Sequence, residues 1–299
     1  MGLLKKENSQ PAVPESQYFT EVGLPNGEYL NRQEEITQEK YTALCNALRQ
    51  ADAIYCPFSL RSGEPYLYMD VLKDDQGYGF SRARIQVWAE EENDRLAPQF
   101  TKPDVEVIRI SAGEDGRGIP AFLGMAFYEN GAEFADINGE PFHIAAEDIL
   151  PRPDLGGIPE NQRPLMNPRA FRWQCHLAQL VGQDNALVRD LEGLFMTQLG
   201  NALLSGKVLL PLLIEGTGEA GTQVSVPAWK GRDGREYVRV FTDWRRLRKG
   251  MDPEKDWSAK TETLDSLIRS YDLALNNSSF RNFGIYIGEN LYQIFSGRQ

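Results

Sequence analysis

The segment Gly216-Thr-Gly-Glu-Ala-Gly221 spells G-x-G-x-x-G directly after an apolar, strand-like run, a spacing used to bind the pyrophosphate of dinucleotides. Such binding requires the motif to open a helix, because the helix N-terminus supplies unpaired N–H groups and a favourable dipole. Here Thr222–Pro227 follows, which is β-branched, alternating and interrupted by proline. The sequence therefore favours a flexible connection between two paired strands, and Gly206-Lys207 likewise lacks the spacing of a phosphate loop.

Histidine and cysteine, which supply many nucleophiles, bases and metal ligands, are scarce in this chain. They are His143, His176, Cys45, Cys56 and Cys175, with no C-x-x-C pair. Cys175 and His176 are adjacent on an expected helix, so they point about 100° apart and cannot easily bind one metal ion together. A pair of Cys175 as nucleophile and His143 as base is arithmetically possible, but no local signature supports it. We therefore expect structural histidines, no catalytic residues, no metal and no cofactor.

Four carboxylates lie within five residues, at Glu90-Glu-Glu92 and Asp94. A calcium loop spaces its ligands at alternate positions around a glycine turn, whereas these residues begin an expected helix. Acidic side chains are favoured in a first helical turn, because the helix dipole attracts negative charge there. The run is therefore interpreted as the solvated start of a helix.

The strongest candidate for a recognition surface is a basic segment around a tryptophan. It comprises Thr242, Asp243, Trp244, Arg245, Arg246, Arg248 and Lys249, with Arg232, Arg235 and Arg239 just upstream. Arginine forms bidentate contacts with carboxylates, and an exposed tryptophan beside arginine is typical of a binding hot spot. The segment could anchor an acidic partner or dock onto the acidic first half of the chain. The alternative is a solvated helix face with Trp244 packed inward.

Periodicity predicts a mixture of helices and strands to carry these residues. Expected helices span Thr37–Gln50, Glu90–Gln99 with an end near Pro98, Pro168–Gly182, Asn185–Ser205, Asp243–Lys249 and Thr263–Tyr271. Expected strands span Ala53–Leu60, Tyr66–Lys73, Ala83–Trp88, Val105–Ile110, Ile119–Tyr128, Phe142–Ile144, Lys207–Glu215, Thr222–Trp229 and Arg235–Phe241, before a hairpin of Phe283–Ile287 and Leu291–Phe295. The predicted fold class is α+β, with mostly antiparallel sheets flanked by helices.

The length of 299 residues suggests about two domains. We expect an irregular lead-in over residues 1–33, an α+β module over 34–150, a linker over 151–168, and a helical lead-in with a second α+β module over 169–299. The linker assignment depends on the prolines and glycines of Leu150–Pro168. Asn167-Pro168 is typical of an N-cap followed by the first residue of a helix.

The net charge of −11 is unevenly distributed, since residues 1–154 carry −13 and the remainder +2. An acidic chain repels phosphate groups, so nucleic acid and anionic membranes are disfavoured, while the acidic half favours solubility or a basic partner. Three cysteines provide no disulfide framework, and there is neither a signal-peptide pattern nor an apolar run of about 18 residues. A cytoplasmic location is therefore expected.

The order of elements suggests an internal repeat. Three segments align in order: Leu44–Leu48 with Leu199–Leu203, Ile54–Phe58 with Val208–Leu212, and Ile85–Glu90 with Val238–Asp243. Each half then reads as a helix, three antiparallel strands and a short helix that begins at an acidic residue. Convergent α+β patterning is the alternative to duplication.

Part of the second half, from about Asn185 to Phe295, resembles the N-terminal domain of the SseB family, a small α+β module named from an enhanced-serine-sensitivity protein. The resemblance lies in Leu203–Ile214 and in Phe241-Thr242-Asp243, because the family characteristically places Phe-Thr-Asp between a strand and a helix. Gly284–Leu291 is similar to the family's terminal hairpin, although Tyr286-Ile287 stands where the family usually carries Asn-Pro. The resemblance implies no established reaction or cofactor.

Together these patterns favour a non-catalytic protein-binding or adaptor protein. Its partner would be another protein, with acidic proteins among the candidates, recognised near Thr242–Lys249 or in the groove between the halves. The alternative is a small-ligand binder or an enzyme that acts at the cleft between the modules. A structural or immunity-like role is a third hypothesis, and the sequence leaves the oligomeric state open.

Overall fold

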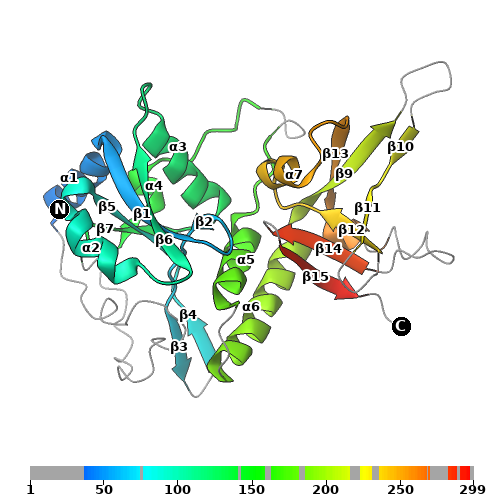
Figure 1. The fold of residues 1–299 in the computed structure, drawn as a ribbon, viewed down its shortest axis with the longest axis horizontal. Coiled ribbons are helices and arrows are strands. Elements are labelled where there is room, and N and C mark those ends of the chain that lie inside the picture. Colours follow the sequence, from blue (N-terminus) through cyan, green and yellow to red (C-terminus); the bar gives the residue numbers. More distant parts are fainter. Residues whose placement is uncertain are drawn as a thin grey trace.

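The computed structural model describes residues 37–74, 77–140, 143–158, 163–181, 186–215, 223–230, 236–267, 269, 282–287 and 290–296. They form two lobes, with helices α5 (Pro168–Leu180) and α6 (Ala186–Leu204) between them (Figure 1). We call residues 37–150 the N-terminal half and residues 168–296 the C-terminal half. No helix in the described part of the chain is long and apolar enough to cross a membrane.

The N-terminal half is built on a mixed sheet. Its helices are α1 (Gln38–Gln50), η4 (Glu90–Glu92), α2 (Asn93–Phe100), α3 (Gly118–Gly124), the π-helical turn η5 (Met125–Glu129) and α4 (Ala146–Ile149). Its strands are β1 (Ala53–Ser59), β2 (Glu64–Pro65), β5 (Arg84–Ala89), β6 (Val105–Ser111), β7 (Phe134–Ile137) and β8 (Ile144–Ala145), beside a separate hairpin of β3 (Val71–Asp74) and β4 (Gly77–Phe80). β1 pairs antiparallel with β2, β5 and β6, β5 pairs parallel with β7, and β7 pairs antiparallel with β8.

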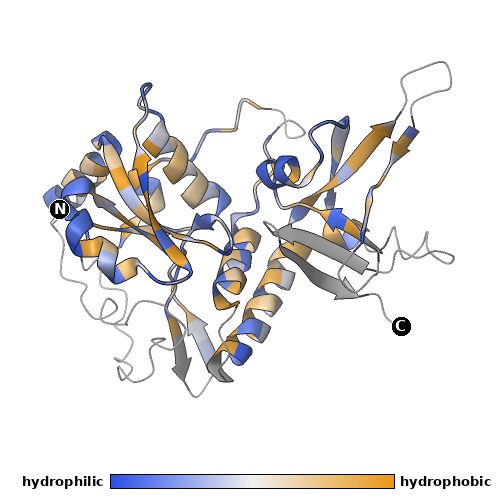
Figure 2. Ribbon diagram, in the orientation of Figure 1, coloured by the Kyte–Doolittle hydropathy of each residue, from blue (hydrophilic) through white to orange (hydrophobic). Residues whose placement is uncertain are grey.

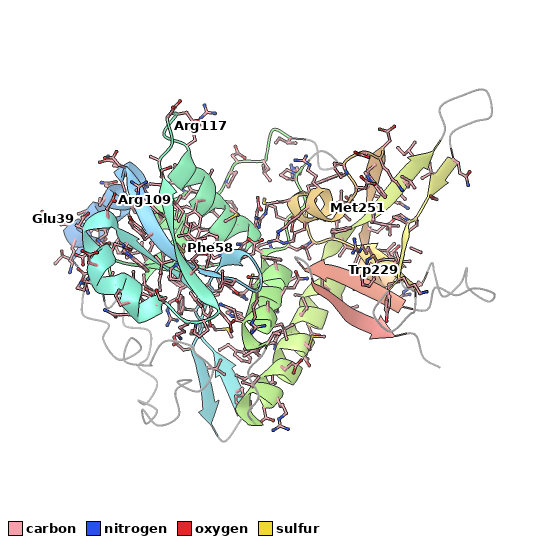
Figure 3. The ribbon with its side chains drawn as sticks, viewed as in Figure 1. Glu39, Phe58, Arg109, Arg117, Trp229 and Met251 are labelled. Atoms are coloured by element: carbon pink, nitrogen blue, oxygen red, sulfur yellow. The ribbon has the colours of Figure 1, made fainter. Side chains whose placement is uncertain are left out.

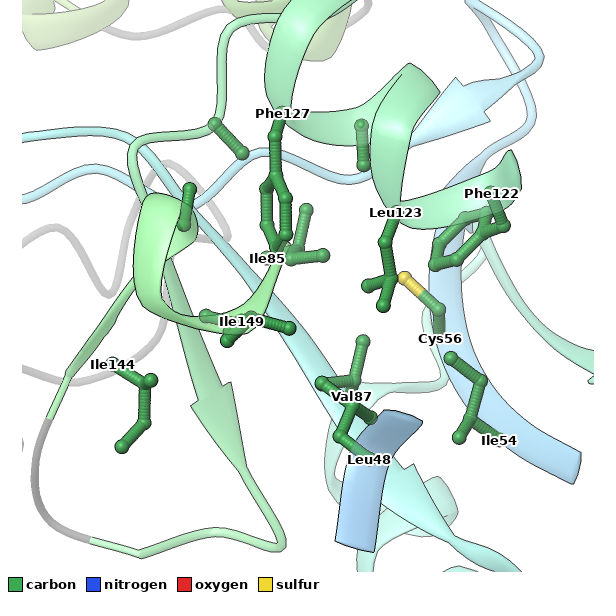
Figure 4. Close-up of a cluster of buried hydrophobic side chains, with 14 of the residues drawn as sticks. Leu48, Ile54, Cys56, Ile85, Val87, Phe122, Leu123, Phe127, Ile144 and Ile149 are labelled. Atoms are coloured by element: carbon green, nitrogen blue, oxygen red, sulfur yellow. The ribbon is translucent and has the colours of Figure 1, made fainter. Parts of the chain in front are cut away.

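Helices cover both faces of this sheet, because its strands carry apolar side chains on both sides. Ile85 and Val87 of β5 join a large cluster with α1, α3 and α4 (Figure 4). Trp88, the next residue along, points to the other face and joins a smaller cluster with α2. This alternation follows from the two-residue period of a strand. Phe58 lies within the N-terminal lobe, whereas Arg117 projects from its surface (Figure 3).

Three predictions for the N-terminal half need correction. The predicted strand Ile119–Tyr128 is wrong, because these residues form α3 and η5. A short apolar run cannot be distinguished by periodicity alone from a buried strand, and this one is buried as a helix. The predicted strand Tyr66–Lys73 is only partly right, since β3 begins at Val71. Pro98 lies inside α2, which ends at Phe100, so the predicted end is two residues early.

The C-terminal half contains a second set of strands. They are β9 (Lys207–Glu215), β10 (Gln223–Ser225), β11 (Ala228–Lys230), β12 (Glu236–Val240), β13 (Trp257–Thr263), β14 (Asn282–Ile287) and β15 (Asn290–Ser296). β9 pairs antiparallel with β10 and β13, β12 pairs antiparallel with β11 and parallel with β14, and β14 pairs antiparallel with β15. An antiparallel bridge between Leu209 and Phe241 connects β9 to the end of β12. Helix α7 (Trp244–Gly250) follows β12, and residues 264–267 and 269 are also helical.

Most C-terminal predictions are confirmed, including α5, α6, β9 and the final β14–β15 hairpin. The single expected strand Thr222–Trp229 is instead two strands, β10 and β11, separated at Val226-Pro227 where proline cannot donate to a ladder. β13 was not predicted. The mixed α+β class with mostly antiparallel pairing is confirmed.

Helix α5 packs against both halves of the molecule. Ala170, Trp173 and Leu177 lie three or four residues apart and join a cluster with α6, β9 and β12. Phe171 and Cys175 face the opposite way and join the cluster of the N-terminal half. Figure 2 shows hydrophobic residues along β9 and a mixture of hydrophobic and hydrophilic residues on α5. The helix after the proline-rich linker therefore belongs to both cores.

Candidate functional site

Helix α7 starts from a capped turn made by Phe241-Thr242-Asp243. The backbone N–H of Arg246 donates to Oδ1 of Asp243 at 2.9 Å, which makes Asp243 the N-cap. The hydroxyl of Thr242 is fully buried and donates to Oδ2 of Asp243 at 2.9 Å. These bonds fix where α7 begins and therefore where its arginines lie.

Arg245 and Arg246 connect α7 to the N-terminal half. Arg246 is 3% exposed, pairs with Asp243, and donates to Oε1 of Glu64 at 3.3 Å and Oδ1 of Asn130 at 3.1 Å. Arg245 donates from Nη2 to Oε2 of Glu64 at 2.7 Å. Glu64 lies on β2, and Asn130 follows η5. The basic segment thus contacts the acidic half of its own chain.

Glu64 is the centre of this contact, although its side chain is only 9% exposed. A buried carboxylate is costly unless it is paired and hydrogen-bonded, and Glu64 also accepts from Nδ2 of Asn130 at 3.0 Å. Glu129 forms a 3.0 Å ion pair with Arg245. Burial raises the pKa of Glu129 above its ordinary value, although Arg245 opposes this. We call these residues, with Asp243 and Arg246, the junction network.

The other residues of the predicted surface divide between core and solvent. Trp244 is half-buried and packs against the cluster of Leu209, Phe241 and Leu247, with Met251 on the same cluster just beyond α7 (Figure 3). Arg248 and Lys249, in the last turn of α7, are exposed. Arg239 lies over the ring of Trp229 and donates to the carbonyl of Gly250, while Arg232 and Arg235 lie outside the described residues.

The glycine-rich segment Gly216–Gly221 also lies outside the described residues, but both of its flanks are described. The strand after it, β10, pairs antiparallel with β9, and Gln223 stands opposite Glu215. A strand and not a helix therefore follows the motif, as predicted. The acidic run Glu90–Glu92 forms the helical turn η4 ahead of α2, again as predicted.

A second polar cluster, which sequence reasoning missed, lies inside the N-terminal half. Arg84 is 2% exposed, donates to Asp70 at 2.6 and 3.0 Å, and donates from Nε to Asp136 at 3.0 Å. Asp136 also accepts from Gln86 and contacts Nδ1 of His143 at 2.5 Å. Arg84 and Gln86 alternate with apolar residues, which is typical of a solvent-facing side. The cluster could have been found from the sequence only by recognising β5 as an interior strand, because both faces of such a strand are covered and its polar side chains are then buried.

His176 and the three cysteines are buried core residues. Burial raises the pKa of the Cys56 and Cys175 thiols, which disfavours their nucleophilic thiolate forms. Cys175 packs in the N-terminal core, whereas His143 contacts Asp136 and the ring of Phe134. No described contact joins Cys175 to His143, so the structure gives no support for a nucleophile–base pair.

His176 should make the stability of the protein fall in acid. Burial lowers the pKa of His176 to about 3, and the nearby Arg172 acts in the same direction. Between pH 6.5 and about 3 the unfolded chain binds a proton at His176 that the folded protein does not bind. The free energy of unfolding should therefore fall with falling pH, by up to about 1.4 kcal/mol per pH unit for this group.

Replacing His176 with phenylalanine isolates this contribution, because the ring lies among Trp173 and Phe195. Urea unfolding at pH 7 and pH 5 should show that His176→Phe loses about 2 kcal/mol less than the wild type over this interval. Equal losses in the two proteins would contradict the assignment.

These features define a class: an α+β protein whose two halves share a central helix and meet in a buried ionic network. Residues 191–273 of this chain match the family model of the SseB protein N-terminal domain. The match extends from α6 through β13 into the helical residues that follow, and it confirms the resemblance drawn from Leu203–Ile214 and Phe241-Thr242-Asp243. No curated protein and no solved structure matches the chain. Among the described residues, no group of three or more His, Cys, Asp and Glu side chains could hold a metal ion.

Proposed function

We propose that this chain is a non-catalytic protein-binding or adaptor protein, built from two related copies of one α+β module. The observation that carries the proposal is the junction network, in which Arg246 and Glu64 pair with each other between the halves. An active site in that position would need converging polar groups available to a substrate. Because those groups are bonded to one another, the outer surfaces of the modules are the regions left for binding. We expect their ligand to be another protein.

The order and direction of strand pairing support the relation between the two modules. In the N-terminal half β1 pairs antiparallel with β2, β5 and β6, β5 is parallel to β7, and β7 is antiparallel to β8. In the C-terminal half β9, β10, β12, β13, β14 and β15 take the places of β1, β2, β5, β6, β7 and β8, with the same directions. A helix, α1 or α6, precedes each set.

The residue register supports the same relation. The sequence repeat equates Tyr55 with Leu209 and Trp88 with Phe241. Tyr55 and Trp88 are cross-strand partners, and so are Leu209 and Phe241. Each pair also contributes to a small cluster under the short helix that follows, α2 in one half and α7 in the other. Convergent patterning would not be expected to reproduce these pairings at aligned positions.

Charge reversal on α7 tests the adaptor role. The double variant Arg248→Glu/Lys249→Glu should recover at least about fivefold less of an acidic partner in affinity purification from native lysate, because charged rim residues steer and hold oppositely charged surfaces. Both side chains are exposed, so folding should be preserved. Quantitative mass spectrometry of the captured proteins provides the measurement.

Arg117→Glu/Arg152→Glu is the matched control, since it makes the same change in charge on one exposed residue of the N-terminal half and one exposed residue of the linker. It should leave the captured set unchanged. An identical profile for the α7 variant and the wild type would count against partner binding at this helix.

The alternative function, binding of a small ligand between the modules, is favoured by one residue. Gln174 is completely buried on α5, and within the described structure neither polar atom of its amide has a hydrogen-bond partner. An orphan amide at such a position is costly unless water or a ligand satisfies it. A thermal-shift screen against amino acids, nucleotides and metal ions would support this alternative if one compound raised the Tm by several degrees and Gln174→Leu abolished the rise.

A further inference from the structure

A pocket of about 280 Å³ opens beside the C-terminal end of α1. It lies where β1 begins and where the parallel strands β5 and β7 end, and its lining includes Leu48, Ala53, Ala89 and Asn138. This volume is at the small end for ligand pockets, so it suits one or two side chains better than a large cofactor. We call it the α1 pocket.

The equivalent position in the C-terminal half is occupied by the chain itself. The repeat places Lys207 at the position of Ala53, and Thr242 at that of Ala89. Nδ2 of Asn167 donates to the backbone carbonyl oxygens of Lys207, at 2.6 Å, and Thr242, at 2.7 Å. These two hydrogen bonds hold the end of the linker against the start of β9 and the end of β12.

The neighbouring residues show what kind of segment fits there. Leu165, two positions before Asn167, packs against the cluster that contains Leu209 and Phe241. At Gly206 a Cβ atom would lie 3.0 Å from Oδ1 of Asn167, so the approach is close. The C-terminal half therefore holds a short segment with an apolar side chain followed by an N–H donor two positions later.

Carboxylates set the chemistry of the α1 pocket. Asp52, which stands at the position of Gly206, lines it together with Glu90 and Glu91, and no lysine or arginine lines it. Glu90 is engaged by Arg109 at 3.2 Å, whereas no described ion pair involves Asp52 or Glu91. A cationic N–H donor gains charge-assisted hydrogen bonds in such a setting, so it is favoured over a neutral amide.

We propose that the α1 pocket binds a basic segment of a partner protein, with an arginine or lysine side chain in the place that Asn167 fills in the C-terminal half. This rests on the two-module organisation proposed above. The site is separate from the exposed charges of α7 and has the opposite sign. One module thus holds the chain's own linker, and the other holds a segment of the partner.

A defined peptide tests the pocket. Residues 163–169, at the end of the linker and the start of α5, read RPLMNPR. The probe is fluorescein-labelled RPLMRPR, with arginine at the donor position. Fluorescence anisotropy with the full chain should show saturable binding. Asp52→Lys/Glu91→Lys should weaken this binding at least about tenfold, and a charge-reversed probe, EPLMEPE, should not bind.

Glu106→Lys/Glu114→Lys is the control, because it makes the same change in charge on exposed residues of the same half. It should alter the affinity by less than about twofold. Absence of saturable binding, equal weakening by both double variants, or binding that requires removal of residues 1–36 would each overturn the proposal. Since the α7 variants are tested by capture of a partner and not by this peptide, failure of the pocket is distinguishable from failure of the adaptor role.

Discussion

Replacing Arg84 with methionine should lower the free energy of unfolding by about 3–5 kcal/mol, since it leaves two buried carboxylates without their counter-charge. Arg84 is the donor shared by Asp70 and Asp136, which are 5% and 0% exposed. Methionine occupies similar volume but neutralises neither of them. Urea denaturation followed by circular dichroism, with the variant and the wild type at the same pH, gives the difference.

Two further variants separate charge from packing in this experiment. Arg82→Met makes the same substitution two residues away at an exposed position over Phe134, so its effect should stay below about 1 kcal/mol. Adding Asp70→Asn and Asp136→Asn to Arg84→Met removes the uncompensated charges and should restore part of the lost stability. If Arg84→Met cost no more than Arg82→Met, the cluster would not be a stabilising ion network.

The sequence predicted those helices and strands whose pattern of apolar residues matches their burial in the structure. β9 is an apolar run that pairs with β10 and β13, and its residues 208–211 are buried. β13 escaped prediction because only one side is covered: Trp257 and Ala259 are half-buried, while their neighbours are polar and exposed. A strand paired on one edge needs little hydrophobicity, since backbone hydrogen bonds to β9 supply much of its specificity.

The ionic pairings could not be read from local sequence at all. The bond from Arg246 to Glu64 joins residues 182 positions apart. Arg246 belongs to a run of basic residues that is equally compatible with a solvated helix, and Glu64 lies in an ordinary turn-like stretch. The two residues lie close together because α5 packs against the cores of both halves. Such a contact depends on tertiary structure, and no spacing rule within either segment encodes it.

Replacing Arg246 with methionine should cost about 3–5 kcal/mol of unfolding free energy, because Glu64 and Asp243 would then lose a buried partner. The guanidinium is 3% exposed and also stacks on Phe171 of α5. Arg248→Met is the matched control on the same helix, and since Arg248 is exposed its effect should be within about 0.5 kcal/mol. Chemical denaturation of the three proteins provides the comparison.

A double-mutant cycle then decides whether this loss comes from the contact between the halves. Glu64→Gln should also destabilise, since Glu64 accepts from Arg245 and Arg246 together. If the two residues act through their mutual contact, the double variant should be less destabilised than the sum of the single variants, by about 1–3 kcal/mol. Strict additivity would mean that Arg246 stabilises only its own helix through Asp243. In that case the two halves would be held together by apolar packing, including that of α5, and the junction network would contribute little to the contact between them.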